Sequence, residues 1–208
     1  HEFGHALNGL FTKSTYPGAQ RSSVDFVELP SQIMENWASH PEVIKMYAKH
    51  YQTGEPIPDE LIQKIVSSQY FNKGFETLEY LAAAILDMDW HMLTDVKDID
   101  VEKFEEKCLN EIGLIPEIAS RYQSTNFNHI FGGDGYSAGY YGYKWSGVLD
   151  SDAFSAFLEH GLYDHATAES FRRNILEKSG SDDPMVLYVR FRGREPKPDA
   201  LIHKLGFN

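Results

Sequence analysis

The sequence has very little cysteine and a shortage of positive charge. Cys108 is the only cysteine among 208 residues, so no internal disulfide can form, and its place in an apolar helical pattern indicates a buried, inert thiol. Lys and Arg together number 19 against 31 Asp and Glu, which gives a formal net charge of −12. Because nucleic acids and anionic membranes repel such a chain, neither is an expected partner.

Long apolar runs are missing as well. No segment approaches the ~20 apolar residues that are needed to span a bilayer, and the first residues do not have the pattern of a signal peptide. An unpaired cysteine suits a reducing compartment. We therefore predict a cytoplasmic location.

Strand patterns are rare. Few segments alternate between apolar and polar residues, whereas many repeat every three or four residues, and a hydrophobic content of 42% is enough for one sizeable core. We predict an all-α fold with very little sheet, in which residues 1–208 form a single helical region. The expected helices cover residues 1–13, 26–39, 42–50, 59–70, 75–93, 101–112, 148–159, 166–178, 183–191 and 200–205, with an exposed loop at 14–23.

The helix expected over residues 75–93 is long and strongly apolar. It carries apolar residues on most sides, including Leu78, Leu81, Ile85 and Leu86. A helix with this pattern is typical of the centre of a helical body.

The first five residues are the most informative about chemistry, and they read His1-Glu2-Phe3-Gly4-His5. On an α-helix His1 and His5 lie on one face, so their two imidazoles can bind one metal ion, most often zinc. Glu2, on the flank of that face, can take a proton from a metal-bound water. Because the pattern also occurs by chance, it needs support from the rest of the chain.

The helix expected over residues 26–39 supplies that support. Glu28, Gln32 and Glu35 follow one another at spacings of four and three, so they share one helical face. Catalytic zinc sites keep three protein ligands and one open position, which makes Glu28 the expected third ligand. Glu35 is then an expected acceptor for the free N–H of a ligating imidazole. The alternative is that both carboxylates are simply solvated.

Residues 129–145 are unusually rich in glycine and tyrosine. Gly132, Gly133 and Gly135 follow His129 closely and predict a mobile loop that moves over a substrate. A phosphate-binding loop is excluded, because the lysine and the preceding strand that such a loop needs are missing.

The tyrosines that follow are spaced for a helix. If a helix begins near Ser137, then Tyr136, Tyr140 and Tyr143 share one face. Together with His129, their hydroxyl groups could stabilise negative charge on a peptide carbonyl oxygen. The alternative is an aromatic stripe that packs in the core.

Three separated blocks in this order resemble the thimet oligopeptidase family of zinc peptidases. The blocks are His1–His5, Asp25–Trp37 and His129–Tyr143. The segments Phe71–Gly74 and Leu86–Met88 are more similar to the bacterial peptidyl-dipeptidase branch of that family. The resemblance covers nearly the whole chain.

This resemblance implies a mostly helical fold with a deep substrate channel, one zinc ion per active site and cleavage of short peptides. In the bacterial branch, dipeptides leave from the C-terminus. The resemblance also implies roles for single residues: zinc ligands His1, His5 and Glu28, a general base in Glu2, transition-state stabilisation by Tyr143 and Tyr136, and substrate contacts from His129, Tyr140, Gly132 and Gly133. The hypothesised reaction is metal-assisted amide hydrolysis.

Two other interpretations stay open. One is an oligoendopeptidase of the same family, which differs in how the end of the channel is closed. The other is a non-catalytic helical fragment or interaction module, because no turn precedes His1 to hold it in place. That missing turn, together with the greater length of family members, leads us to expect the C-terminal part of a longer peptidase whose N-terminal portion is its partner.

Overall fold

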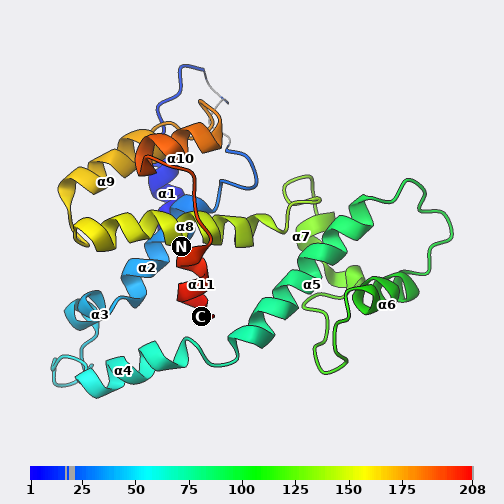
Figure 1. The fold of residues 1–208 in the computed structure, drawn as a ribbon, viewed down its shortest axis with the longest axis horizontal. Coiled ribbons are helices and arrows are strands. Elements are labelled where there is room, and N and C mark those ends of the chain that lie inside the picture. Colours follow the sequence, from blue (N-terminus) through cyan, green and yellow to red (C-terminus); the bar gives the residue numbers. More distant parts are fainter. Residues whose placement is uncertain (17, 19–21, 208) are drawn as a thin grey trace. The chain divides into compact units, whose positions relative to one another are not determined.

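The structure is a computed structural model that describes residues 1–16, 18 and 22–207. Within these residues it is helical throughout (Figure 1), with a single isolated bridge between Lys49 and Pro56 in place of a sheet. The all-α prediction is confirmed. The helices are α1 (Glu2–Phe11), α2 (Leu29–Ser39), α3 (Pro41–Tyr47), α4 (Asp59–Ser68), α5 (Lys73–His91), α6 (Val101–Glu111), η1 (Ser124–Asn126), α7 (Asn128–Phe131), α8 (Gly142–His160), α9 (His165–Phe171), η2 (Arg172–Leu176), α10 (Pro184–Arg192) and α11 (Asp199–Leu205).

Most helix boundaries lie within a few residues of those predicted. Helix α1 ends two residues early, and α2 begins at Leu29 because Glu28 occupies the N-cap position. The expected loop at 14–23 contains residues 17 and 19–21, which lie outside the described residues, and its other residues form no helix. None of the described helices is long and apolar enough to cross a membrane.

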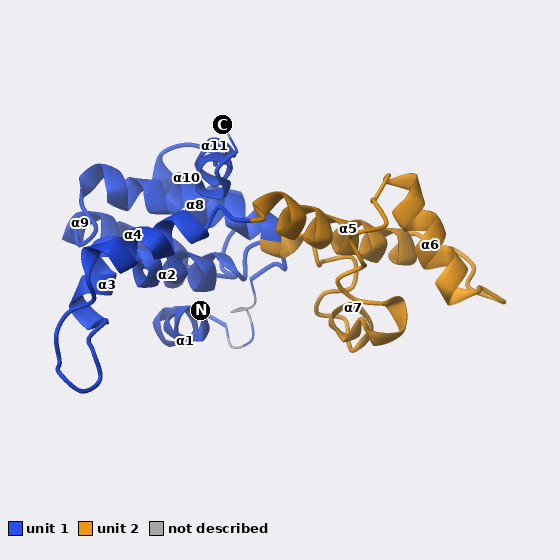
Figure 2. Cartoon of the chain, turned by 90° about the horizontal axis from the view of Figure 1, so that it is seen from below, with its two compact units in different colours: residues 1–71, 144–208 blue, residues 72–143 orange. Residues whose placement is uncertain are grey.

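The described chain divides into two compact units (Figure 2). Unit 1 comprises residues 1–71 and 144–208, and unit 2 comprises residues 72–143. The first two residues of α8 belong to unit 2 and the rest of that helix to unit 1. That residues 1–208 act as one catalytic region stays a prediction.

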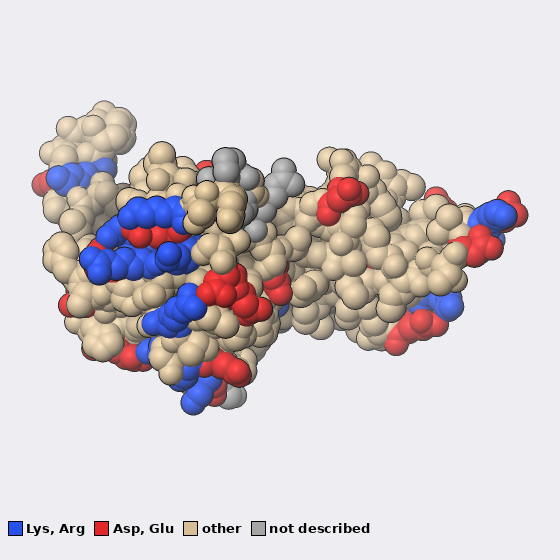
Figure 3. Space-filling model, turned by 90° about the horizontal axis from the view of Figure 1, so that it is seen from above, with Lys and Arg blue, Asp and Glu red and all other residues tan. Residues whose placement is uncertain are grey.

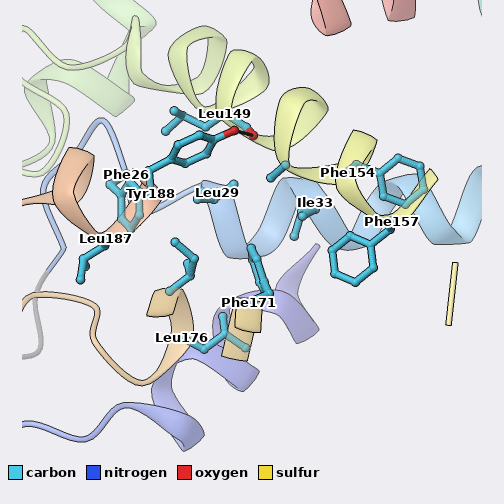
Figure 4. Close-up of a cluster of buried hydrophobic side chains, with 12 residues drawn as sticks. Phe26, Leu29, Ile33, Leu149, Phe154, Phe157, Phe171, Leu176, Leu187 and Tyr188 are labelled. Atoms are coloured by element: carbon cyan, nitrogen blue, oxygen red, sulfur yellow. Dashed lines mark hydrogen bonds between the residues drawn. The ribbon is translucent and has the colours of Figure 1, made fainter. Parts of the chain in front are cut away.

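An apolar core holds unit 1 together (Figure 4). The start of α2 and the residues just before it contribute Phe26, Leu29 and Ile33, each at most 2% exposed. Their neighbours come from α8, α9, η2 and α10, and they are Leu149, Ala153, Phe154, Phe157, Phe171, Ile175, Leu176, Leu187 and Tyr188. Full burial of one such large apolar side chain contributes roughly 1.5–3 kcal/mol. The core therefore fixes the orientation of α2.

Unit 1 also buries an ionic network. Asp152 of α8 is 2% exposed and accepts hydrogen bonds from the Tyr188 hydroxyl at 2.7 Å and from the Arg194 guanidinium at 2.7 and 3.0 Å. Burial, together with the neighbouring carboxylate, raises the pKa of the Tyr188 phenol.

The surface of unit 1 also carries charges of both signs. On the face drawn in Figure 3, Lys and Arg side chains of unit 1 lie beside Asp and Glu side chains. Acidic and basic groups are thus interspersed there, despite the negative net charge.

Helix α5 of unit 2 has two different faces. On one face Ala83 and Ala84 pack against Phe127, Ile130 and Tyr140. On the other, apolar side chains at helical spacing are between 37% and 50% exposed, namely Phe75, Leu78, Leu81, Ile85 and Met88. The prediction that this helix lies in the centre of the fold is therefore wrong for this chain, because only one of its apolar faces is covered.

Helices α1 and α2 approach each other closely at Gly4. A Cβ atom at position 4 would lie 2.3 Å from the carbonyl oxygen of Pro30 and 2.5 Å from the Cα of Ser31. These are backbone atoms of the first turn of α2, so they cannot turn aside as a flexible side chain does. Only glycine allows the two helices to pack at this distance.

Replacing Gly4 tests this packing. We expect Gly4→Ala to lower the free energy of unfolding by about 1–3 kcal/mol, because the added methyl group overpacks the α1–α2 contact. Gly9→Ala on the same helix is the matched control, since a Cβ there meets nothing within 4 Å. The control should be neutral or stabilising by up to about 1 kcal/mol through helix propensity. Denaturant unfolding of both variants measures the difference, and equal stability would contradict the argument.

Candidate metal centre and tyrosine cluster

The two histidines of the opening motif lie side by side. Helix α1 places His5 one turn after His1, with ring centroids 5.1 Å apart and an interplanar angle of 80°. Glu28, at the N-cap of α2, meets both rings: its Oε2 lies 3.4 Å from His1 Nε2 and 3.1 Å from His5 Nε2. One ligand atom from each of the three residues lies within 4.8 Å of the others. The structure thus brings the three predicted metal ligands together.

The surroundings of Glu28 suit a metal ligand. Its side chain is buried, with a residue exposure of 3%, and the Ser31 hydroxyl donates to Glu28 Oε2 at 2.8 Å. Ser31 itself is fully buried. A buried carboxylate is costly unless positive charge or hydrogen-bond donors surround it. Two imidazole nitrogens and one carboxylate oxygen that converge on one point form the usual donor set of a catalytic divalent metal site.

Glu35 contacts the imidazole nitrogen of His1 that does not face Glu28. The Nδ1 atom of His1 lies 2.6 Å from Glu35 Oε1, which leaves Nε2 directed toward Glu28. Such a carboxylate partner fixes the tautomer and the orientation of a ligating imidazole. The ring of His1 is therefore held by a carboxylate and by its edge contact with His5, although the residue stands just before the first helical turn.

Glu2 is exposed in the first turn of α1, directly after His1. Glu2 and the two histidines thus lie at the same end of α1, its N-terminal end. The role of Glu2 as general base stays a prediction.

The prediction that a helix begins near Ser137 is wrong. Helix α8 begins at Gly142, because Ala138 adopts a left-handed conformation with a φ of 53° that an α-helix cannot contain. Tyr136 and Tyr140 consequently lie in turns that precede the helix, and only Tyr143 lies within it.

The predicted aromatic residues nevertheless gather in unit 2. The rings of Tyr136 and Tyr143 stack at a centroid distance of 5.2 Å and an angle of 12°. The exposed His129 of α7 has its ring centroid 6.0 Å from Tyr136, 5.7 Å from Tyr140 and 6.3 Å from Tyr143. Four predicted site residues therefore form one cluster. The turns before α8 bring them together, and not a shared helical face.

Tyr140 is the most buried member of this cluster. It is 4% exposed and packs on Phe127 and Tyr80. Burial raises the pKa of its phenol to about 12, although the nearby Arg121 guanidinium acts in the opposite direction. A phenol with this pKa stays protonated at neutral pH and acts as a hydrogen-bond donor. Tyr140 therefore also fits the alternative interpretation, in which the tyrosine packs in the aromatic core.

The two glycines that follow α7 differ in what they require. A Cβ at Gly132 would lie 2.5 Å from Asn128 Oδ1 and 2.6 Å from its carbonyl oxygen, so position 132 needs glycine. A Cβ at Gly133 would meet nothing within 4 Å. Gly132 is the C-cap residue of this short helix and donates its N–H to the Asn128 carbonyl oxygen at 2.7 Å.

Sequence reasoning missed the residues that hold these groups in place. Ser31 could have been found, because it follows Glu28 by three residues. Asp87 is fully buried on α5, and its carboxylate accepts the backbone N–H groups of Ala138 and Tyr140. The only indication of this in the sequence is an aspartate within a strongly apolar helix.

Comparisons with known proteins agree with the motifs. The sequence matches the family described as Peptidase family M3 over residues 1–207. It is 44% identical over 212 residues to the dipeptidyl carboxypeptidase of Escherichia coli, covering 100% of this chain and 31% of that protein. It is 39% identical to oligopeptidase A of Salmonella typhimurium, covering 99% of this chain and 31% of that protein.

A more distant relative is saccharolysin of Saccharomyces cerevisiae, at 31% identity over 99% of this chain and 29% of that protein. The chain thus spans roughly a third of the length of these curated relatives. The resemblance to a peptidase family that the three sequence blocks indicate is confirmed. The chain belongs to peptidase family M3.

Proposed function

We propose that this chain carries the catalytic region of a zinc-dependent peptidase that releases dipeptides from the C-termini of short peptides. The observation that supports it best is the convergence of His1, His5 and Glu28 within 4.8 Å of one another, in a member of a peptidase family. In this proposal residues 1–208 act as one catalytic region, and the lone, buried cysteine suits a cytoplasmic location.

The proposed metal is zinc, held by the two imidazoles and the Glu28 carboxylate. Nitrogen and carboxylate ligands in a set of three are typical of catalytic zinc, which keeps a fourth position open. When bound, the metal would polarise the scissile carbonyl and lower the pKa of a water molecule. Glu35 would keep His1 oriented, because its oxygen lies 2.6 Å from His1 Nδ1.

The protein groups would divide the proton and charge transfers between them. Glu2 is proposed to take the proton of the attacking water and to pass it to the leaving amine. Tyr143 and Tyr136 are proposed to donate hydrogen bonds to the carbonyl oxygen as it gains negative charge. Their stacked rings, 5.2 Å apart, support a shared role.

Substrate contacts are proposed for the residues around this tyrosine pair. His129 is exposed beside both rings, and Gly132 and Gly133 are exposed at the end of α7, where the lack of side chains leaves space for a peptide to approach. Tyr140 is only 4% exposed, so its proposed contact with substrate is limited to the small part of its side chain that reaches the surface.

Release of dipeptides is favoured over internal cleavage by the comparisons. The relative named dipeptidyl carboxypeptidase is 44% identical, against 39% for oligopeptidase A. Because a relative named oligopeptidase A also matches nearly the whole chain, an oligoendopeptidase is the second candidate. The products of a peptide substrate distinguish the two.

The proposed partner of this chain is the remainder of a longer peptidase polypeptide. The relatives are roughly three times as long as the segment that this chain matches. The uncovered face of α5, whose apolar side chains are 37–50% exposed, supports a further segment packing there, because exposed apolar rows mark interaction surfaces. A non-catalytic helical module is the competing proposal, and it predicts that the protein neither retains zinc nor hydrolyses peptides.

Zinc content and reaction products test the proposal directly. We expect the intact polypeptide to retain about one zinc ion per chain through dialysis, because three protein ligands hold it. Chelation should abolish hydrolysis of a blocked peptide, and added zinc should restore it. Mass spectrometry should show loss of two residues at a time from the C-terminus. Internal cleavage would favour the oligoendopeptidase, and a zinc-free, inactive protein would favour the non-catalytic module.

Glu2→Gln separates metal binding from proton transfer. Glutamine keeps the shape of the side chain but cannot take a proton, so we expect kcat to fall by roughly a hundredfold or more, with zinc content unchanged. Glu60→Gln is the matched control, because Glu60 also lies in the first turn of a helix and is exposed. Steady-state kinetics and elemental analysis measure both variants. A Glu2→Gln protein with full activity would exclude Glu2 as the general base.

Tyr143→Phe removes one hydroxyl and keeps the ring. We expect kcat to fall by roughly a hundredfold, the cost of removing one donor to a developing oxyanion, while KM changes little. Tyr141→Phe is the control, since Tyr141 is two residues away and 43% exposed. If Tyr143→Phe and Tyr141→Phe have the same kcat as the unchanged protein, Tyr143 does not stabilise the transition state.

A further inference from the structure

The carboxylate of Asp87 is a buried group that the proposed function does not use. Asp87 lies on the covered face of α5 and is 0% exposed. Its Oδ1 accepts the N–H of Ala138 at 3.0 Å, and its Oδ2 accepts the N–H of Tyr140 at 2.9 Å. His91, one turn later on α5, has its Nδ1 atom 2.8 Å from Asp87 Oδ1. A buried carboxylate is tolerated when its oxygens accept hydrogen bonds in this way.

The backbone that Asp87 holds has an unfavourable conformation. Ala138 has a φ of 53°, a left-handed conformation that residues other than glycine rarely adopt. Such a residue keeps this conformation only when its surroundings hold it there. The carboxylate of Asp87 bonds the N–H of Ala138 itself and that of the second residue after it, so it is well placed to do so.

A second group of α5 holds the same turn from its carbonyl side. The hydroxyl of Tyr80 donates to the backbone carbonyl oxygen of Tyr140, and the two rings stack at a centroid distance of 5.2 Å. At the other end, the Ser137 hydroxyl donates to the carbonyl oxygen of Ile130 at 3.1 Å. Tyr140 is thus held at its N–H, its C=O and its ring by one face of α5.

The turn at 138–140 joins the two stacked tyrosines. Tyr136 precedes it by two residues and Tyr143 follows it by three, and their rings stack at an angle of 12°. Whatever fixes the turn therefore fixes the separation and orientation of both hydroxyl-bearing rings. A displacement of about 1 Å in catalytic groups can cost about a hundredfold in rate.

We propose that Asp87 is a positioning residue that clamps the 138–140 turn and thereby holds Tyr136 and Tyr143 in their working arrangement. This rests on the proposed function, in which the two tyrosines stabilise the transition state. Asp87 acts through backbone N–H groups and not on the substrate. The clamp belongs wholly to unit 2.

Asp87→Ala and Asp87→Asn in the intact peptidase test the clamp with two readouts. The first is amide hydrogen exchange at Ala138 and Tyr140, which we expect to accelerate by roughly tenfold or more in Asp87→Ala. The second is steady-state kinetics, in which kcat should fall by roughly tenfold to a hundredfold with KM and zinc content little changed. Asp87→Asn keeps one acceptor oxygen, so its exchange and kcat should lie between those of Asp87→Ala and the unchanged protein.

Leu86→Ala is the matched control for loss of stability. Leu86 is the preceding residue of α5 and is also 0% exposed, so its truncation leaves a cavity without removing a hydrogen bond to the turn. We expect Leu86→Ala to lower the melting temperature and to leave kcat and the exchange of the two amides unchanged well below that temperature.

The outcomes separate the clamp from the proposed function. Wild-type exchange and kcat in Asp87→Ala would overturn the clamp, as would losses that merely match those of Leu86→Ala. If Asp87→Ala does not fold, Asp87→Asn decides by the same criteria. An unchanged protein that hydrolyses no peptide would refute the peptidase proposal, and in that case the exchange of the two amides alone still decides whether Asp87 holds the turn.

Discussion

The contact of Gly4 with the first turn of α2 is the constraint on which the candidate metal centre depends. A Cβ at position 4 would lie 2.3 Å from the Pro30 carbonyl oxygen, so the two helices meet at a distance that no other residue permits. At this distance the imidazole nitrogens of His1 and His5 lie between 2.6 and 3.4 Å from carboxylate oxygens of Glu28 and Glu35. A separation larger by the width of one methyl group would break contacts of this length. The apolar core beneath α2 maintains the contact from the other side, because it leaves that helix one orientation.

The candidate metal ligands could be identified from sequence because their spacing follows the helical repeat. His1 and His5 are one turn apart, and Glu28 and Glu35 two turns apart, so each pair shares a face whatever the rest of the chain does. What the sequence could not supply was the docking of one face on the other. That docking depends on a backbone-to-backbone approach at Gly4, and glycine inside a helical pattern has several possible causes. Ser31, which donates to Glu28 Oε2 at 2.8 Å, does not depend on this docking, because it follows Glu28 by three residues and could have been found from that spacing.

The tyrosine cluster was predicted correctly in its members and wrongly in its geometry. Spacings of four and three suggested a shared helical face, but the rings of Tyr136 and Tyr143 meet across a turn whose central Ala138 has a positive φ. Local propensity does not place alanine in that conformation. The hydrogen bonds that favour it come from Asp87, which is 51 residues earlier in the chain. Long-range bonds between a side chain and the backbone leave no periodic pattern, so the start of α8 could not be located from sequence.

Each unit has a buried carboxylate beside the groups that are proposed to take part in catalysis. Glu28 is 3% exposed and Asp87 is 0% exposed, and each would strongly destabilise the fold if its partners moved away. The partners differ in kind. Glu28 faces two imidazole nitrogens and one hydroxyl, whereas Asp87 faces the single imidazole of His91 and accepts two backbone N–H groups. The first arrangement suits the binding of a metal ion, and the second suits a fixed backbone turn. The cost of burying each charge thus favours one local arrangement in each unit. The imidazole pair suits Glu28 to its proposed role as a metal ligand, and the two backbone N–H groups suit Asp87 to its proposed role as a support.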